Sequence, residues 1–329
     1  MPRVSVIMPV LNAERFIGAA IASVQAQTFD DWELLVVDDG STDASVRIVV
    51  DAQRGDPRIR LVDNRAGPAH GAAVARNIGI AQAEGDLVAF LDADDLYEPD
   101  KLADEVELLA AHPEAAMVYG PALWWRDGDE SWRWTEPMHR EAGRLHMPTS
   151  LLRRVIVSGD GQVPCTCSVL IRREALVRVG GFDERFRLYE DQTLWVKLFL
   201  SFPVYVHDSC HARYRQHSDS TSAMAARAGE YAQNENHAAR GDFLAWVDHY
   251  CKGTGVIDPR LQRSIRVARS PYIENQGFQH RLDLARVATK HRLRKLRARA
   301  ARLAKSLRGF GRKRWEDPSS RTAKSSRRL

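Results

Sequence analysis

The sequence lacks several features that would place the chain in particular protein classes. No run of 18 or more apolar residues occurs among the 329 residues, so we expect no membrane-spanning helix. The four cysteines show no C-x-x-C spacing and are too few for a disulfide scaffold, which favours a reducing, cytoplasmic location. The first residues already have the pattern of a strand, so we expect no signal peptide.

Glycine-rich phosphate loops are also missing. No G-x-G-x-x-G follows the first expected strand, which argues against a Rossmann dehydrogenase. A sugar nucleotidyltransferase would need a glycine-rich phosphate loop with a basic residue near the N-terminus. The segment Pro9–Gly18 does not have this pattern, so that class is only an alternative.

Charge is distributed unevenly along the chain. The whole sequence has 48 Lys/Arg and 43 Asp/Glu, a formal net charge of +5. From Arg281 to Leu329 there are 18 basic and 3 acidic residues, so the first 280 residues carry a net charge near −10. The basic character therefore belongs to the tail, whereas the acidic body favours binding of a cation.

Hydrophobic patterning predicts an α/β fold with a mostly parallel central sheet flanked by helices. Strand-like segments alternate with segments of helical spacing, and such sheets bind ligands at the carboxyl ends of their strands. Asn12 and Asp100 are placed to cap helices, the second of which ends near His112. A helix is expected over 191–202, and residues 124–147 have the pattern of a loop. The strand-like segments are 4–8, 33–37, 58–62, 87–91, 115–119 and 168–171.

The sharpest motif is Asp92-Ala93-Asp94-Asp95, which directly follows the apolar strand at 87–91. Three like charges within four residues repel one another unless something cationic joins them. Mg²⁺ and Mn²⁺ prefer such oxygen ligands and leave positions open for substrate phosphates. The alternative is a solvated acidic turn that caps the next helix, which begins near Pro99.

Three further motifs carry polar groups suited to chemistry. Asp38-Asp39-Gly40 ends the second strand, where a carboxylate can accept a pyrimidine imide N–H or can form an Asx turn. Glu190-Asp191 begins a helix, either as a cap or as a carboxylate that removes a proton from an acceptor alcohol. The segment 213–217 (RYRQH) offers cations and an imidazole to a leaving diphosphate or a metal, or is an exposed basic loop.

Seven motifs occur in one order over about residues 3–222. They are VSVIMPVLN at 4–12, SVQAQTF at 23–29, VDDGSTD at 37–43, ARNIG at 75–79, FLDADD at 90–95, GGFDE at 180–184 and EDQTLW at 190–195. In this order and rough spacing, the motifs resemble family 2 glycosyltransferases. The Gln-x-x-Arg-Trp signature of processive synthases is absent from this stretch, which favours transfer of one sugar at a time.

The resemblance implies a GT-A fold and assigns roles to residues of this sequence. Asp191 would be the general base, and Asp94 with His217 would bind Mn²⁺ or Mg²⁺ next to the diphosphate. Pro9 and Asp39 would line the base pocket. The substrate-binding residues implied by the resemblance are Pro9, Val10, Asn12, Glu14, Asp38, Asp39, Arg76, Asp92, Ala93, Glu190 and Arg215.

The implied activity is inverting, metal-dependent transfer of a sugar from a nucleoside diphosphate, with a lean toward UDP, to an acceptor hydroxyl. The acceptor would be a saccharide or a lipid-linked sugar, in cell-surface polysaccharide or glycolipid synthesis. An inactive nucleotide-sugar-binding module on the same fold is the main alternative. It is disfavoured because every expected catalytic position is filled.

We expect three parts: a glycosyltransferase domain at 1–223, a helical basic extension at 224–312 and a basic, disordered tail at 313–329. Apolar residues recur between Leu282 and Leu307 among many Lys and Arg, which predicts a basic helix. Such a helix could lie on an anionic membrane surface, at the inner face of the cell membrane, or could dock on the acidic body as an oligomer contact. Nucleic-acid binding is disfavoured because the tail has few aromatic residues.

Overall fold

The computed structural model describes residues 3–64, 70–129, 131–138, 140–232, 236–274, 277–293 and 296. The chain divides into two compact units, Met1–Arg269 and Ser270–Leu329, and both sheets belong to the first. Among the described residues, no helix has the length and apolar character needed to cross a membrane.

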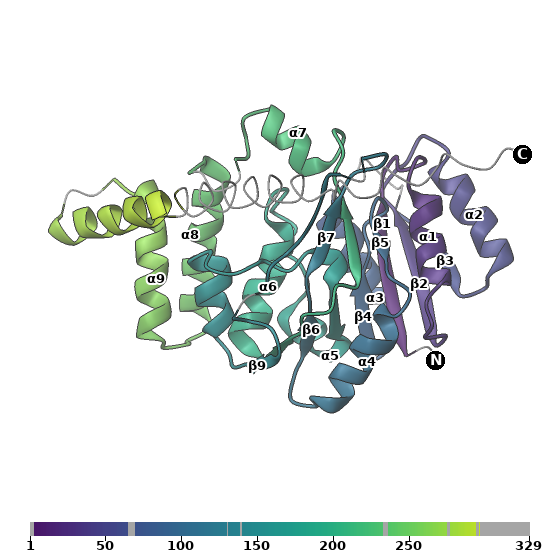
Figure 1. Ribbon diagram of the computed structural model, residues 1–329, viewed down its shortest axis with the longest axis horizontal. Helices are drawn as coiled ribbons and strands as arrows, with labels where there is room; N and C mark the ends of the chain where they lie inside the picture. The colour runs from purple at the N-terminus through teal and green to yellow at the C-terminus, as the bar shows by residue number, and fades with distance from the viewer. Residues whose placement is uncertain are drawn as a thin grey trace, which may run out of the picture. The chain divides into compact units, whose positions relative to one another are not determined.

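An eight-stranded mixed sheet forms the centre of the first unit (Figure 1). In spatial order its strands are β3 (Ile59–Asp63), β2 (Trp32–Asp38), β1 (Val4–Val10), β4 (Leu87–Phe90), β10 (Val169–Arg172), β6 (Met117–Tyr119), β11 (Val204–Val206) and β9 (Arg144–His146). Strands β1 to β4 are parallel, whereas β10 runs antiparallel to β4 and β6. The expected α/β fold is confirmed, and β10 makes its sheet mixed.

Helices cover both faces of this sheet. One layer contains α1 (Ile17–Gln25), α2 (Ser45–Gly55) and α4 (Lys101–Ala111), and the other α3 (Ala72–Gln82), α5 (Arg173–Val179) and α6 (Glu190–Ser201). Met8 faces the first layer and Ile7 the second, so successive residues of β1 are buried on opposite faces. A Cβ on Gly79 would lie 2.4 Å from Ile7 Cγ2, so glycine is needed for α3 to approach β1.

A second, four-stranded sheet lies partly within the segment expected to be a loop. Its strands in order are β5 (Leu96–Tyr97), β12 (Ala212–Arg215), β7 (Ala122–Trp125) and β8 (Arg133–Thr135). The loop prediction for 124–147 is therefore wrong. Trp124 and Trp134 are cross-strand partners whose ring centroids lie 5.6 Å apart. The strands that contain residues of this segment have only three or four residues, too few for an alternating pattern to be recognised.

The two expected helix caps have different outcomes, and neither side chain caps its helix. Asp100 occupies the N-cap position of α4, which ends at its C-cap His112 as expected, but the Asp100 side chain makes no capping hydrogen bond. Asn12 does not cap α1, because the N-cap residue there is Phe16. Instead Asn12 has a left-handed φ of 51°, and its Oδ1 accepts a bond from Thr42 N at 2.8 Å. The Asn12 side chain therefore stabilises the loop after β2 and not the N-terminus of α1.

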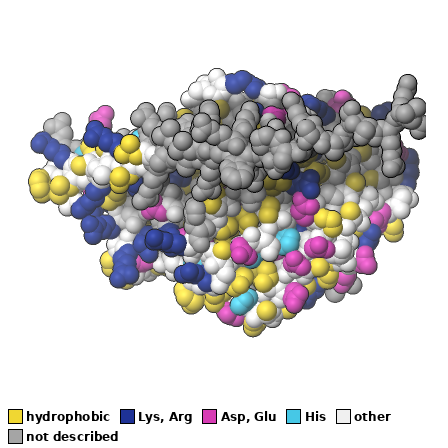
Figure 2. Space-filling view, in the orientation of Figure 1, with side chains coloured by type: hydrophobic (Ala, Val, Ile, Leu, Met, Phe, Trp, Pro, Cys, Tyr) yellow, Lys and Arg dark blue, Asp and Glu magenta, His cyan; other side chains and the backbone are white. Residues whose placement is uncertain are grey.

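The rest of the first unit is mainly helical. The elements are η1 (Leu152–Val157), η2 (Thr166–Ser168), α7 (Thr221–Arg227), α8 (Ala238–Gly253) and α9 (Pro259–Arg269). Helix α8 packs on α6 and α9, and the domain boundary expected after residue 223 falls inside α7. Lys and Arg side chains gather on the surface over α9 (Figure 2).

The second unit contains η3 (Ser270–Tyr272) and a helix over residues 278–293. The expected basic helix is confirmed over this part. Apart from Leu296, the remainder of that expected helix to Leu307 and the predicted tail at 313–329 lie outside the described residues.

Candidate active site

Arg76 on α3 joins the end of β4 to the beginning of α6. Its Nη2 donates to Asp92 Oδ1 at 2.6 Å and its Nη1 to Glu190 Oε1 at 3.4 Å. The Arg76 side chain is only 3% exposed, whereas the side chains of Asp92 and Glu190 are 27% and 21% exposed, so the guanidinium is buried and the two carboxylates are partly open to solvent. Burial alone would lower the pKa of Arg76, but the two carboxylates more than offset this and raise it. The junction brings together three residues predicted for the donor site.

Asp191 lies beside this junction, in the first turn of α6. Burial raises the pKa of its half-buried carboxyl to about 7, and the negative charge of Glu190 adds to the rise. The Gln192 backbone N–H donates to Asp191 Oδ1 at 2.7 Å, which opposes the rise. A carboxylate with a pKa near neutrality is suited to accept a proton from an alcohol. Its role as general base stays a prediction.

Asn77, next to Arg76, ties the segment before α6 to α3. Its Oδ1 accepts the Phe182 N–H at 2.9 Å, and its Nδ2 donates to the Phe182 carbonyl at 3.1 Å. Gly181 has a φ of 60°, and a Cβ there would lie 2.4 Å from Asn77 Oδ1. Two motifs more than 100 residues apart therefore meet here, and their contact holds the segment 181–184 against α3.

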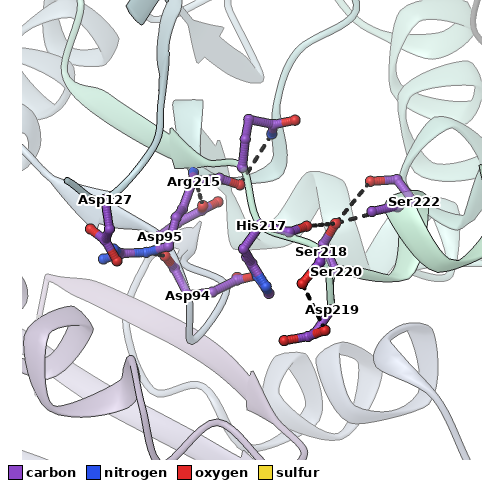
Figure 3. A network of polar contacts seen from close by, with 11 residues as sticks. Asp94, Asp95, Asp127, Arg215, His217, Ser218, Asp219, Ser220 and Ser222 are labelled. Atoms are coloured by element: carbon purple, nitrogen blue, oxygen red, sulfur yellow. Dashed lines mark hydrogen bonds and ion pairs between the residues drawn. The ribbon is translucent and has the colours of Figure 1, made fainter. Parts of the chain in front are cut away.

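A second cluster combines Asp94, Arg215 and His217 (Figure 3). His217 Nε2 lies 2.8 Å from Asp94 Oδ2, and Arg215 Nε donates to the Asp94 carbonyl oxygen at 2.6 Å. Arg215 also pairs with Asp127, and its guanidinium lies over the ring of Phe16. Because Arg215 is 5% exposed and held from several sides, it supports the Asp94 loop in this structure.

The three carboxylates after β4 have three different partners. Asp92 pairs with Arg76, and Asp94 faces the imidazole of the second cluster. Asp95 is 1% exposed and accepts the Arg215 backbone N–H at 2.8 Å. Burial, and then the charges of Asp94 and Asp92, raise the pKa of Asp95 well above its usual range. Each of the three carboxylates has a partner within the protein, so the repulsion among them does not by itself require a bound cation.

Asp94 and His217 are still a suitable donor pair for a divalent ion. The Asp94 carboxylate oxygen and the His217 nitrogen converge, and His217 Nδ1 is buried with no hydrogen-bond partner among the described residues. Within those residues no group of three or more His, Cys, Asp or Glu side chains is arranged to hold a metal. Mg²⁺ and Mn²⁺ sites commonly combine one or two protein ligands with substrate phosphates and waters. The residues present fit that type of site.

Asp39 holds the segment that begins α3. Its Oδ1 accepts from Asn64 Nδ2 and from the His70 N–H, both at 3.0 Å. Its Oδ2 accepts the Gly71 N–H at 2.7 Å. A carboxylate has about four acceptor positions, and these bonds occupy three of them. The His70 Nδ1 also lies 3.6 Å from Asp39 Oδ1. Contact with a nucleotide base at Asp39 stays a prediction.

The other residues predicted near the donor mainly shape the loops in this structure. Glu14 Oε2 accepts the Ala44 N–H at 2.9 Å, so the loop after β1 is joined to the loop after β2. Asp38 is buried and accepts the Ser41 N–H at 3.1 Å. Pro9 and Val10 end β1, and Ala93 lies three residues after the end of β4. The side chains of Val10 and Ala93 pack in the core.

Several residues that position these groups carry no recognisable sequence signal. Phe16 packs on His217 with ring centroids 4.7 Å apart, and Asp127 pairs with Arg215. Tyr189, directly before Glu190, has a left-handed φ of 67°. Only an unusual non-glycine backbone angle marks it, and that angle cannot be recognised from residue type.

Comparison with known proteins assigns the chain to a family. The model of glycosyl transferase family 2 matches residues 5–180. TuaG of Bacillus subtilis, named for teichuronic acid biosynthesis, is 32% identical over 235 residues, 70% of this chain and 85% of TuaG. WfgD of Escherichia coli is 43% identical over 117 residues, 36% of this chain and 44% of WfgD. Its name is UDP-Glc:alpha-D-GlcNAc-diphosphoundecaprenol beta-1,3-glucosyltransferase.

Solved structures share the fold at low sequence identity. Staphylococcus aureus TarS in complex with UDP-GlcNAc has a TM-score of 0.62 and 20% identity, over 83% of this chain and 71% of TarS. The mannosyltransferase PcManGT of Pyrobaculum calidifontis, with GDP-Man and Mn²⁺, has a TM-score of 0.57 and 20% identity, over 94% of this chain and 79% of PcManGT. Together with the family match, these findings confirm the expected GT-A fold and show that the chain is a glycosyltransferase belonging to glycosyl transferase family 2.

Proposed function

We propose that the chain transfers a sugar from a UDP-sugar to an acceptor hydroxyl with inversion at the anomeric carbon, in a reaction that needs Mn²⁺ or Mg²⁺. The observation that carries this proposal is the Arg76 junction. It holds Asp92 and Glu190 together next to Asp191, whose pKa burial raises to about 7. These groups supply a donor-binding carboxylate and a base from separate elements.

The chain's own residues have distinct tasks in this proposal. Asp191 accepts the proton of the acceptor hydroxyl. The oxygen of that hydroxyl attacks the anomeric carbon from the face opposite the diphosphate, which departs. A positioned base of this kind contributes about 10²–10⁴-fold to the rate. Arg76 keeps Asp92 and Glu190 oriented toward the donor sugar, and this prior orientation avoids a reorganisation cost during transfer.

Asp94 and His217 would hold the divalent ion, with diphosphate oxygens completing its coordination. When bound, such an ion neutralises the charge that develops on the departing diphosphate. The Mn²⁺ in PcManGT supports this part of the proposal. The UDP-GlcNAc in TarS and the UDP-Glc in the name of WfgD support a UDP-linked donor.

We place the acceptor in cell-surface polysaccharide or glycolipid assembly. TuaG is named for teichuronic acid biosynthesis and WfgD for a diphosphoundecaprenol-linked acceptor. A basic C-terminal segment that contacts an anionic inner membrane surface would bring the chain close to such an acceptor. A homo-oligomer formed through the same segment is the alternative role.

The test combines donor binding with turnover. Thermal unfolding with a panel of nucleotide-sugars should show stabilisation by a UDP-sugar that requires Mn²⁺, and the anomeric proton of the product should have the inverted configuration by NMR. Asp191→Asn should keep the donor-induced stabilisation and lose at least about 100-fold in turnover. Retention of configuration, or an Asp191→Asn rate within about tenfold of wild type, contradicts the proposed mechanism.

A further inference from the structure

A pocket of about 570 Å³ lies between the loop that leads into α6 and helix α8. The loop contributes Phe186, Arg187 and Leu188, and α8 contributes Asp242, Ala245 and Trp246. This volume is within the range of sites that bind small molecules. None of the residues predicted from the sequence for the donor site lines it.

The walls of the pocket offer two kinds of surface. The Phe186 and Trp246 rings meet edge to face, with centroids 5.6 Å apart, and Leu188 extends the apolar wall. Charged side chains of both signs, including Arg187 and Asp242, line the same pocket. A sugar ring has apolar C–H faces and hydroxyl edges that donate and accept hydrogen bonds. It can use both surfaces at once, whereas a hydrocarbon chain could use only the apolar wall.

The pocket is close to the proposed base along the chain. Leu188 precedes Asp191 by three residues, so their Cα atoms lie at most ~11 Å apart. A second connection runs through Glu230, which lines the pocket, to its neighbour Tyr231. The Tyr231 ring lies 6.2 Å, between centroids, from the ring of Tyr189, which precedes Asp191 by two residues.

Tyr189 joins the pocket wall to α6 in a defined geometry. Its ring stacks on Phe243 of α8 at 5.1 Å between centroids and 16° between planes. Its hydroxyl lies 3.0 Å from His237 Nε2, next to the start of α8. Arg240 lies over the Tyr189 ring, and its Nη2 donates to the Ile156 carbonyl at 2.6 Å. A ligand in the pocket would therefore bind at a fixed position relative to Asp191.

We propose that this pocket binds a sugar ring of the acceptor that lies one or more rings away from the reacting hydroxyl. The acceptor is then an oligosaccharide whose end ring is at Asp191 and whose next part is held by Phe186, Trp246 and the charged groups. This inference rests on the proposed glycosyl transfer and adds the class of acceptor to it.

The test fills the pocket without removing any packing. Ala245 is exposed on α8 and lines the pocket, so Ala245→Trp adds a ring to it. Ala22 is exposed on α1 and does not line the pocket, so Ala22→Trp is the matched control. The full-length chain, with UDP and Mn²⁺ present, is titrated calorimetrically with methyl glycosides of mono-, di- and tetrasaccharides and with n-octyl monosaccharides.

Wild type and Ala22→Trp should bind an oligosaccharide of the panel at least about tenfold more tightly than any monosaccharide. Ala245→Trp should lose this advantage and keep the thermal stabilisation by UDP and Mn²⁺. Wild-type oligosaccharide affinity in Ala245→Trp would overturn the proposal. So would binding of octyl monosaccharides as tight as that of oligosaccharides, or no binding of any oligosaccharide. Failure of the proposed function would be distinguishable, because the stabilisation by UDP would then be missing from all three proteins.

Discussion

The raised pKa of Asp191 should reduce the stability of the folded chain at neutral pH. Burial and the Glu190 charge move the pKa of this carboxyl from its ordinary value of 3.8 to about 7. The folded state then binds a proton more tightly than the unfolded state, so stability falls as pH rises through this interval. Each pH unit of the interval is worth about 1.36 kcal/mol, so the ionised group destabilises the fold by about 4 kcal/mol at pH 8.

Asp191→Asn should remove this cost, because the amide has the same shape and cannot ionise. Urea unfolding of the full chain should show the variant more stable by about 4 kcal/mol at pH 8 and by about 2 kcal/mol at pH 5. Asp208→Asn is the control, since this exposed aspartate should change stability by no more than about 0.5 kcal/mol at either pH. An equal difference at both pH values, or a less stable Asp191→Asn protein at pH 8, would refute the reasoning.

Three other predictions use activity or binding. The kcat/KM of wild type should rise about tenfold per pH unit below about pH 7 and level off above it. Because Glu190 raises the pKa of Asp191, Glu190→Gln should shift this rise of kcat/KM to lower pH. A rise at the same pH as in wild type would contradict the effect of Glu190 on the pKa of Asp191. Asp94→Ala should abolish the Mn²⁺-dependent stabilisation by a UDP-sugar and leave the unfolding midpoint without ligand nearly unchanged. Full activity of the wild-type protein in excess chelator would exclude the metal assignment. The full chain should sediment with vesicles rich in anionic lipid at low salt and a version ending at residue 280 should not, since each Lys or Arg near the surface contributes about 1 kcal/mol; equal sedimentation would argue against membrane contact.

The arrangement of β1 to β4 could be predicted from the sequence because its physical causes are local. A strand buried on both faces has a nearly continuous apolar run in place of an alternating pattern, and β1 and β2 show such runs at residues 6–10 and 34–37. Polar groups that directly follow such strands must lie at the carboxyl edge of the sheet. For this reason the positions of Asp39 and Asp94 just beyond the strand ends could be predicted, whereas the family was identified from the resemblance of seven motifs.

The contacts of those groups were decided only by the tertiary structure. Arg76 meets Asp92 and Glu190 because α3, β4 and α6 pack together, and no local pattern encodes which carboxylate pairs with which cation. The short strands within 124–147 form because β12 and β11, from later in the chain, supply their partners. Strands of three or four residues are too short to show a periodicity of their own.

The sequence by itself determined the α/β fold, the family and the residue types available for catalysis. The pKa of Asp191 and the pocket beside Phe186 depend on burial and on neighbours brought in from elsewhere in the chain. Both are therefore properties of packing, since desolvation and charge act over distances in space and not along the sequence.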